Sequence, residues 1–507
     1  MSKMMRTTSM AALLSAVTLG TTLPAAARGR TMADLVGIAS GTADGDVGKS
    51  SPAAQADLLS RITGLGLHRV RIDFTWNLLQ PTPTTWNWGA YDAFVRTAQN
   101  EHVEILGILD YGAAWANKAV YAPNGDENAP PDQFKDFINY ADTVVKRYKG
   151  TVKAYEIWNE PNNGNHFWHS ACPNFPGLPC PGRNRLPPPL GSQPGVKGVD
   201  HAPRASTGTD GDPVLFSALA ASTMDAIRGM KLGADTPLLA PGGTVFLWSP
   251  LNTSGPDFMK AAFAANRQLG TTSDAVTLHG YTAYPPSVEP EHAESQWLPV
   301  GQLGPVPVRV PLQMPNVQLG AKVTEMKATF AAAGTAPSKP VWLTEIGWPN
   351  KNGVDEGKQA RWLVRSIVLA ALNDVDLLYI YNMYDKQNNS DTGETVFIPE
   401  DYFGLVQRGG RPKQAYNAIK LFMQKFGGYR VQSRLPAHGP KNSVYIVQLT
   451  DEHGHEAWVV WDSIEEGTGF KWKLPVNATC TGFLGGGCAA DHGMIAVNST
   501  PVYVTTR

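Results

Sequence analysis

Neither sign of charge is in excess in this 507-residue chain. Lys and Arg number 43 and Asp and Glu 44, which gives a formal net charge of -1 at pH 7. A protein that holds nucleic acid or an anionic membrane through its electrostatic field needs a strongly positive surface. We therefore expect neither of these as a partner.

Long apolar segments are also lacking beyond the N-terminus. Residues 1–27 have the pattern of a signal peptide, with Lys3 and Arg6 ahead of an apolar stretch at residues 10–19 and small residues at 25–27 for cleavage. This stretch is shorter than the ~20 residues of a spanning helix, although an uncleaved anchor is the alternative. We expect a secreted or periplasmic protein with no membrane contact beyond the export signal.

Cysteine is scarce, and its four residues fall into two local pairs, Cys172 with Cys180 and Cys480 with Cys488. Such pairs predict two short disulfide loops in an oxidising compartment. For the first pair, a zinc site completed by His166 and His169 is an alternative. The segment has no Cys-x-x-Cys and is rich in Pro and Gly, which favours the disulfide.

Glycine, proline and tryptophan are abundant. The chain has 50 Gly, 39 Pro and 14 Trp, a composition that indicates many loops and flat apolar faces. Sugars pack their C–H groups on indole rings and seek hydrogen bonds around the rim. With 42% hydrophobic residues, the chain can form one barrel and a smaller domain.

Strand-like and helix-like segments alternate eight times. The candidate strands are residues 35–39, 68–73, 103–109, 152–158, 237–240, 275–279, 341–345 and 377–381. The candidate helices are residues 53–65, 91–101, 132–149, 213–231, 257–269, 319–333, 357–372 and 413–426. The strands are apolar with little polar alternation, as in a parallel sheet covered by helices. The pattern predicts an α/β fold, a (β/α)8 TIM barrel over residues 28–428.

A different pattern begins near residue 429. Short strands at residues 444–449, 457–461, 470–474, 494–497 and 502–504, separated by Gly-rich turns, predict a small C-terminal β-sandwich over residues 429–507. Trp458, Trp461 and Trp472 are candidate sugar platforms. Aromatic residues in short strands more often build the core, and that interpretation is favoured.

Three intervals are too long for ordinary connections: residues 162–212, 281–315 and 385–402. Each follows a predicted strand, so each leaves the barrel at its mouth. We interpret them as walls of a substrate cleft, with mobile surface insertions as the alternative.

Two glutamates stand where predicted strands end. Glu160 lies in Trp-Asn-Glu-Pro and Glu345 in Thr-Glu-Ile-Gly-Trp, and the following Pro or Gly stops the strand. The carboxyl ends of barrel strands carry the catalytic residues of this fold. A carboxyl pair facing one cavity can split an acetal, one group donating a proton and the other attacking carbon.

On these two signatures, the barrel resembles the clan A retaining glycoside hydrolases, and most closely glycoside hydrolase family 39, which includes β-xylosidases and exopolysaccharide glycosidases. The resemblance implies that Glu160 is the general acid/base and Glu345 the nucleophile. It also implies that no metal or organic cofactor is needed.

Four further residues match positions of the family. By this resemblance Asn159 binds the sugar 2-hydroxyl, His279 and Tyr281 form the strand-six motif that positions the nucleophile, and Arg71 lies beneath it. A positive charge close to a carboxyl lowers its pKa, so Arg71 is suited to keep Glu345 ionised. Arg71 and His279 have a second interpretation as satisfied core residues.

Glu156 is also on strand four. At about 3.3 Å per residue it lies some ~13 Å deeper than Glu160, too far for both to reach one glycosidic oxygen. We expect Glu156 to be a buried ion-pair partner.

Aromatic residues near strand ends are candidates for sugar binding, although most Trp residues in a barrel are packed. These candidates are Trp76, Trp115, Trp168, Trp348 and Tyr384. The chain departs from the clan at strand eight, where a tryptophan is common and this chain reads Tyr-Asn-Met-Tyr-Asp over residues 381–385.

The sequence predicts a secreted retaining glycosidase acting on a polysaccharide or oligosaccharide. The alternative is a catalytically silent carbohydrate-binding or exopolysaccharide-assembly protein on the same scaffold, because a fold does not establish an activity.

Overall fold

The computed structural model describes residues 30–118, 125–164, 167–169, 211–246, 254–282, 296–303, 306–312, 318–351, 354–386, 399–436, 438–439, 442–465 and 467–506. The predicted signal peptide, His166 and the Cys172–Cys180 pair lie outside these residues. Within them, no helix combines the length and the hydropathy that crossing a membrane requires.

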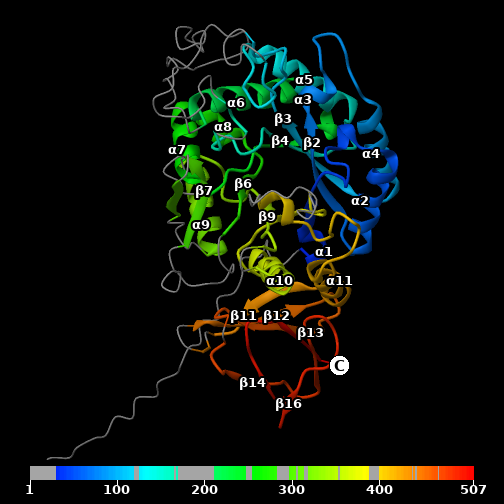
Figure 1. The fold of residues 1–507 in the computed structure, drawn as a ribbon, viewed down its shortest axis with the longest axis vertical. Helices are drawn as coiled ribbons and strands as arrows, with labels where there is room; N and C mark the ends of the chain where they lie inside the picture. Colours follow the sequence, from blue (N-terminus) through cyan, green and yellow to red (C-terminus); the bar gives the residue numbers. More distant parts are fainter. Residues whose placement is uncertain are drawn as a thin grey trace, which may run out of the picture.

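Eight parallel strands form the centre of the larger domain (Figure 1). Their order is β5-β4-β3-β2-β1-β10-β9-β6, and His279 N donates to Thr244 O at 3.0 Å beside the β5 edge, which nearly closes the sheet. The strands are β1 (Val36–Ala39), β2 (Arg69–Thr75), β3 (Glu104–Asp110), β4 (Ala154–Ile157), β5 (Leu238–Pro241), β6 (Val276–His279), β9 (Val341–Ile346) and β10 (Leu377–Tyr381). The predicted (β/α)8 barrel is confirmed.

Helices surround these strands (Figure 1). They are α2 (Pro52–Gly64), α4 (Gly89–Asn100), α5 (Phe134–Arg147), α6 (Pro213–Gly229), α7 (Gly255–Ala265), α8 (Arg267–Thr272), α9 (Leu319–Ala332), α10 (Glu356–Leu372) and α11 (Gln414–Phe426). The prediction of one helix over residues 257–269 is wrong. Asn266 has extended backbone and its side chain accepts from Gln268 N, so it ends α7 and caps α8.

Several short elements lie between these helices and strands. They are α1 (Met32–Leu35), α3 (Trp76–Leu79) and the 3-10 helices η2 (Val47–Lys49), η4 (Gly233–Asp235) and η6 (Pro399–Tyr402). The interval after β6, predicted as a loop, contains an antiparallel pair, β7 (Gln296–Leu303) with β8 (Val306–Leu312). Apolar residues run through both strands without strict alternation, which hid this pairing in the sequence.

Side chains of β2 alternate between the barrel interior and the helix layer. Val70, Ile72 and Phe74 are buried in the apolar core shared with the helices. Arg71 faces inward, where it meets residues of β4 and β9. By the same alternation Asp73 also faces the interior. The interior is therefore polar toward its carboxyl end.

The C-terminal domain is antiparallel. One sheet has the order β11-β12-β13-β18-β15 and the other β14-β17-β16. The strands are β11 (Arg430–Arg434), β12 (Val444–Thr450), β13 (Glu456–Asp462), β14 (Lys471–Lys473), β15 (Ala478–Thr481), β16 (Ala490–Asp491), β17 (Met494–Ala496) and β18 (Val502–Thr506). The predicted β-sandwich is confirmed, and Figure 1 shows it next to α10 and α11.

The tryptophans of this domain build its interior. Trp461 is fully buried and stacks on Tyr445. Trp458 and Trp472 pack together in the cluster that links the two sheets. Their interpretation as core residues fits this packing, whereas that of sugar platforms does not.

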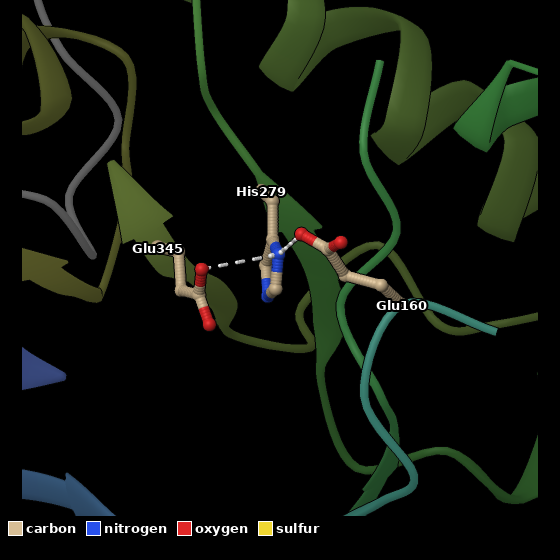
Figure 2. A group of neighbouring side chains, drawn as sticks. All are labelled: Glu160, His279 and Glu345. Carbon is tan, nitrogen blue, oxygen red and sulfur yellow. Dashed lines mark hydrogen bonds and ion pairs between the residues drawn. The ribbon is translucent and has the colours of Figure 1, made fainter. Parts of the chain in front are cut away.

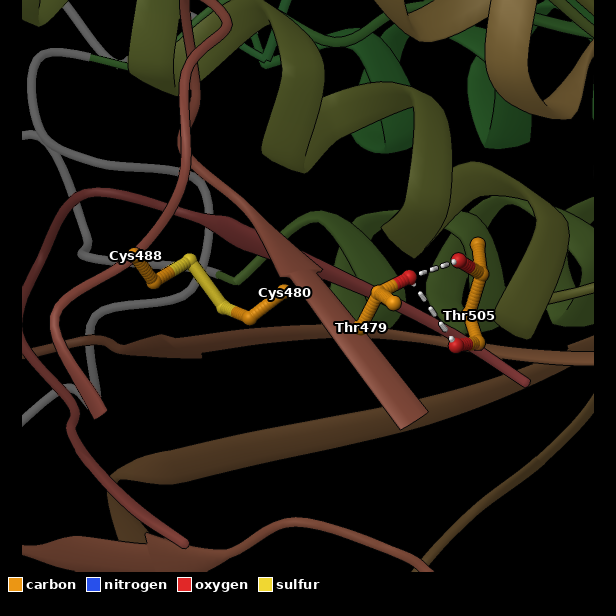
Figure 3. Close-up of a disulfide and its surroundings, with 4 residues drawn as sticks. All are labelled: Thr479, Cys480, Cys488 and Thr505. Atoms are coloured by element: carbon orange, nitrogen blue, oxygen red, sulfur yellow. Dashed lines mark hydrogen bonds between the residues drawn. A yellow bond between two sulfur atoms is a disulfide. The ribbon is translucent and has the colours of Figure 1, made fainter. Parts of the chain in front are cut away.

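The disulfide Cys480–Cys488 is present, as predicted (Figure 3). The disulfide closes the loop between Cys480, which lies in β15, and Cys488. Cys488 N also donates a hydrogen bond to Cys480 O. On the barrel side of the domain, Tyr503 of β18 packs against Phe422 and Phe426 of α11. This contact makes the core of the sheet continuous with that of the barrel.

Candidate active site

Glu160 stands just past the end of β4, where the chain changes direction. Trp158 and Glu160 both have positive φ, 69° and 42°, and Pro161 follows. Glu160 N donates to Gly243 O at 3.1 Å, which ties this turn to the segment after β5. The turn ends the strand and sets the direction of the Glu160 side chain. Glu160 as a whole residue is 5% exposed.

Glu345 lies within β9, near its carboxyl end, and is 8% exposed. Its Oε1 accepts a hydrogen bond from Arg71 Nη1 at 2.7 Å, and its Oε2 accepts one from the Tyr281 hydroxyl at 2.6 Å. Both carboxylate oxygens are therefore held by donors from elsewhere in the barrel, one on β2 and one in the segment after β6.

His279 lies between the two carboxyl groups (Figure 2). Its Nδ1 is 2.7 Å from Glu160 Oε1 and 3.7 Å from Glu345 Oε2. One donor atom from each of the three side chains lies within 4.8 Å of the others. Retaining glycosidases hold their carboxyl groups about 5–5.5 Å apart, whereas inverting ones leave roughly 6.5–9.5 Å. The approach of one oxygen from each carboxyl group to within 4.8 Å is nearer the first range than the second.

Arg71 joins the nucleophile candidate to the strands around it. Its Nε donates to Glu156 Oε2 at 2.6 Å, and its Nη2 donates to Asn159 Oδ1 at 2.9 Å. Asn159 Nδ2 in turn donates to the Tyr111 hydroxyl at 2.9 Å. Glu156 is fully buried and paired with Arg71, in the place predicted for an ion-pair partner.

The surroundings shift the pKa values of Glu345 and His279 in opposite directions. Burial raises the pKa of Glu345, but the charges of His279 and Arg71 and the hydrogen bond from Tyr281 outweigh it, and the net pKa is lowered. Burial lowers the pKa of His279, but Glu345 and the hydrogen bond to Glu160 outweigh it, and the net pKa is raised. Glu345 is thus held ionised, and His279 takes up a proton more readily than a free imidazole.

Three residues that the sequence analysis missed adjoin this network. Tyr111 follows β3, and its ring stacks on Phe167. Asp73 follows Arg71 by two residues on β2, and Asp110 ends β3. The rule that strand ends carry the site, applied to β3, would have found Tyr111 and Asp110. The alternation of β2 would have found Asp73.

Asp73 and Asp110 form a carboxyl pair. Burial raises the pKa of Asp73 to about 6, with a further contribution from the charge of Asp46. Burial, and then the charge of the neighbouring Asp73, raise the pKa of Asp110 well above its usual range. Asp110 is fully buried. Both carboxyl groups therefore hold a proton more tightly than a free aspartate does.

Four of the five aromatic candidates pack against the outer helices and are at most 5% exposed, a packing that does not support the predicted sugar binding. Trp76 stacks on Tyr140 of α5, Trp168 contacts Phe216 of α6, Trp348 contacts Trp362 of α10, and the Tyr384 hydroxyl donates to Asp57 of α2 at 2.6 Å. Large apolar rings at loop bases fill the space between loop and helix, which strand-end position alone does not reveal.

Trp115 and Tyr381 are placed differently. Trp115 is partly exposed, and its Nε1 donates to Gln80 O at 2.8 Å, so its role stays a prediction. Tyr381 ends β10, with its ring edge-on to Tyr281 at 6.4 Å. Of the two tyrosines after which the chain leaves strand eight, Tyr381 thus contacts a residue of the site, whereas Tyr384 contacts α2.

The zinc alternative can be followed only at His169. Its Nδ1 lies 2.6 Å from Asp126 Oδ2. The other three residues of that proposal lie outside the described residues.

Comparison with known proteins finds similarity of structure. No protein-family model and no curated protein matches the sequence. A family 39 glycoside hydrolase from Bacteroides cellulosilyticus WH2 aligns with a TM-score of 0.63 at 17% identity, covering 95% of this chain and 82% of that one. A family 39 β-xylosidase from Caulobacter crescentus aligns at 0.56 and 14%, covering 94% and 96%. The family 39 enzyme from Xanthomonas axonopodis pv. citri aligns at 0.55 and 15%, covering 95% of both chains.

The resemblance to glycoside hydrolase family 39 is confirmed in the fold. At these identities the likeness concerns the scaffold, including its second, smaller domain. The roles of individual residues rest on the geometry of the site itself.

The carboxyl pair predicts how stability depends on pH. A raised pKa in the folded state means that the folded protein binds the proton more tightly, so this stabilisation is complete below about pH 4 and is lost as the pH rises through about 6. In wild type the free energy of unfolding should fall between pH 4 and 7, and Asp73→Asn should make this fall smaller by about 1–2 kcal/mol, because asparagine does not titrate. The expected size is modest because Asp73 is only partly buried. Urea unfolding across that range measures it. Asp235→Asn, at an exposed position, is the control, and an equal pH dependence in wild type and Asp73→Asn would refute the raised pKa of Asp73.

Proposed function

We propose that the protein is a retaining glycoside hydrolase acting on a polysaccharide or oligosaccharide, with Glu160 as general acid/base and Glu345 as nucleophile. The observation that carries this proposal is the approach of the two carboxyl groups to within 4.8 Å across His279. The different environments of the two groups support the division of roles. Export to the periplasm or the medium, proposed from the sequence pattern, fits such a substrate.

In the first step, a carboxylate oxygen of Glu345 attacks the anomeric carbon while the bond to the leaving oxygen breaks. Glu160 gives its proton to that oxygen, and a glycosyl ester of Glu345 forms. Glu160 Oε1 and His279 Nδ1 are 2.7 Å apart, a hydrogen bond in which the proposed mechanism requires a transferable proton, as carboxylic acid or as imidazolium. The leaving group can therefore be protonated without a proton from solvent.

In the second step, water attacks the anomeric carbon while the bond from that carbon to the Glu345 oxygen breaks; Glu160 takes the proton of the water, and the sugar and the Glu345 carboxylate are released. Esterification removes the negative charge of Glu345, so the repulsion between the two carboxyl groups disappears and Glu160 acts as a base. Arg71 and Tyr281 still hold the oxygens of Glu345 and favour the carboxylate as leaving group. The same pair thus serves both halves of the reaction.

Asn159 is proposed to bind the sugar 2-hydroxyl. Its amide is fixed by Arg71 on one side and Tyr111 on the other, so its orientation is set before substrate arrives. Preorganised polar groups lower the barrier because they need no reorganisation in the transition state. A β-xylosidase is among the proteins that share the fold, so β-xylosides belong in the first substrate panel.

Substitution of the two glutamates tests this proposal. Glu160→Gln should lower kcat roughly 10²–10⁴-fold, the usual contribution of a general acid, and Glu345→Gln at least as much. Azide should restore turnover of a Glu160→Ala variant by forming a β-glycosyl azide. Hydrolysis of aryl glycosides and polysaccharides, with products identified by mass, measures this.

Glu104→Gln is the matched control, because Glu104 begins β3 at the opposite end of the barrel and is exposed. Its activity should equal that of wild type. A wild type that turns over no glycan but binds one, with affinity unchanged in both glutamine variants, would instead show a carbohydrate-binding protein.

A metal requirement is tested separately, because two carboxylates and an imidazole can also hold a divalent cation. Both oxygens of Glu345 already accept hydrogen bonds, which favours the proton-transfer arrangement. Treatment with a chelator should leave kcat unchanged within about twofold. Loss of activity that zinc restores would assign the three residues to a metal.

A further inference from the structure

Lys322 is a buried amine behind the proposed catalytic residues. It lies in the first turn of α9 and is 4% exposed, although lysine is rarely buried without a partner. Its Nζ donates to the carbonyl oxygen of Tyr281 at 2.6 Å. It also lies 4.9 Å from the centre of the Phe246 ring. No step of the proposed reaction uses this side chain.

The segment that Lys322 holds also carries the tyrosine that contacts the nucleophile. Gly280 N donates to the backbone oxygen of Glu345 at 2.8 Å. Gly280 itself is enclosed by Leu343 and Leu319, whose side chains would lie only 3.0–3.2 Å from an added Cβ. The backbone before Tyr281 is thus fixed on one side by β9 and on the other by α9.

Lys322 supplies the attachment after that point. The Tyr281 hydroxyl must reach Glu345 Oε2 at 2.6 Å, at the far end of a long side chain, so a small rotation of the backbone at Tyr281 displaces it. The hydrogen bond to the Tyr281 carbonyl opposes that rotation. The line of contacts runs from Lys322 Nζ through Tyr281 to Glu345.

We propose that Lys322 is a positioning residue that fixes the backbone of Tyr281 and so keeps its hydroxyl on Glu345. This inference rests on the proposed function. Lys322 touches neither the substrate site nor the reacting carboxylates, and acts through Tyr281.

The hydrogen bond, rather than charge, is what positions the tyrosine. Burial lowers the pKa of Lys322 to about 7, and Glu325, on the next turn of α9, opposes this by a smaller amount. Other titratable groups around this segment include His279 at the end of β6, Tyr281 just after it, Glu345 on β9 and Lys327 on α9. A neutral amine still donates an N–H, so the attachment persists on both sides of pH 7.

A double-mutant cycle with Tyr281→Phe tests the inference. A hydrogen bond to a charged group is worth roughly 10–100-fold in rate, so Tyr281→Phe should lower kcat by about that factor. Lys322→Met should lower kcat about tenfold with KM within about twofold, and should add nothing in the Tyr281→Phe background. Independent, multiplied losses in the double variant, or wild-type kcat in Lys322→Met, would overturn the proposal.

Lys327→Met is the matched control, because Lys327 is on the same helix and is partly exposed. It should retain wild-type kcat. Thermal unfolding checks that each variant folds, and Lys322→Gln, whose shorter amide falls short of the carbonyl, replaces Lys322→Met if that variant does not.

Crystal structures of wild type and Lys322→Met give a readout that needs no turnover. The Tyr281 hydroxyl should move beyond hydrogen-bond distance, about 3.5 Å, of Glu345 in the variant. An unmoved tyrosine would overturn the positioning role even if wild type is active. A moved tyrosine in a protein that hydrolyses no glycan would uphold the positioning of Tyr281 while the proposed function fails.

Discussion

One buried guanidinium holds the centre of this barrel together. Arg71 is 3% exposed, and its three nitrogens each donate to a different side chain, on Glu156, Glu345 and Asn159. A buried charge is tolerated only when it is paired and hydrogen-bonded. Because these partners come from β4, the turn after it and β9, the position of β2 fixes the orientation of the nucleophile and of the amide beside the acid.

The two glutamates are supported in different ways. Glu345 belongs to a regular strand, and its oxygens are held by side chains from β2 and from the segment after β6. Glu160 belongs to a turn with left-handed backbone, held by Gly243 O and by His279. A nucleophile needs a fixed line of attack, which a strand provides. An acid that later becomes a base needs a proton partner, which His279 provides.

Much of this arrangement could be predicted from sequence because it follows local rules. Apolar runs alternating with helix-like segments located every strand of the barrel, and the two signatures located Glu160 and Glu345. The packing of the aromatic candidates could not be predicted, because a ring at a strand end can turn inward or toward a helix, as Trp168 and Tyr384 do. The raised pKa values of Asp73 and Asp110 depend on two strands meeting, which no local pattern contains.

Charge balance explains why these carboxyl groups behave differently. Glu156 and Glu345 share the permanent cation of Arg71, and His279 adds positive charge beside Glu345. Asp73 and Asp110 are buried beside one another, and for both of them burial outweighs the charge of Arg71, so retaining a proton costs less than ionising both. A second cation at that position would ionise the pair, but it would also compete with Arg71 for Glu345. Leaving the pair protonated therefore keeps Arg71 directed at the nucleophile.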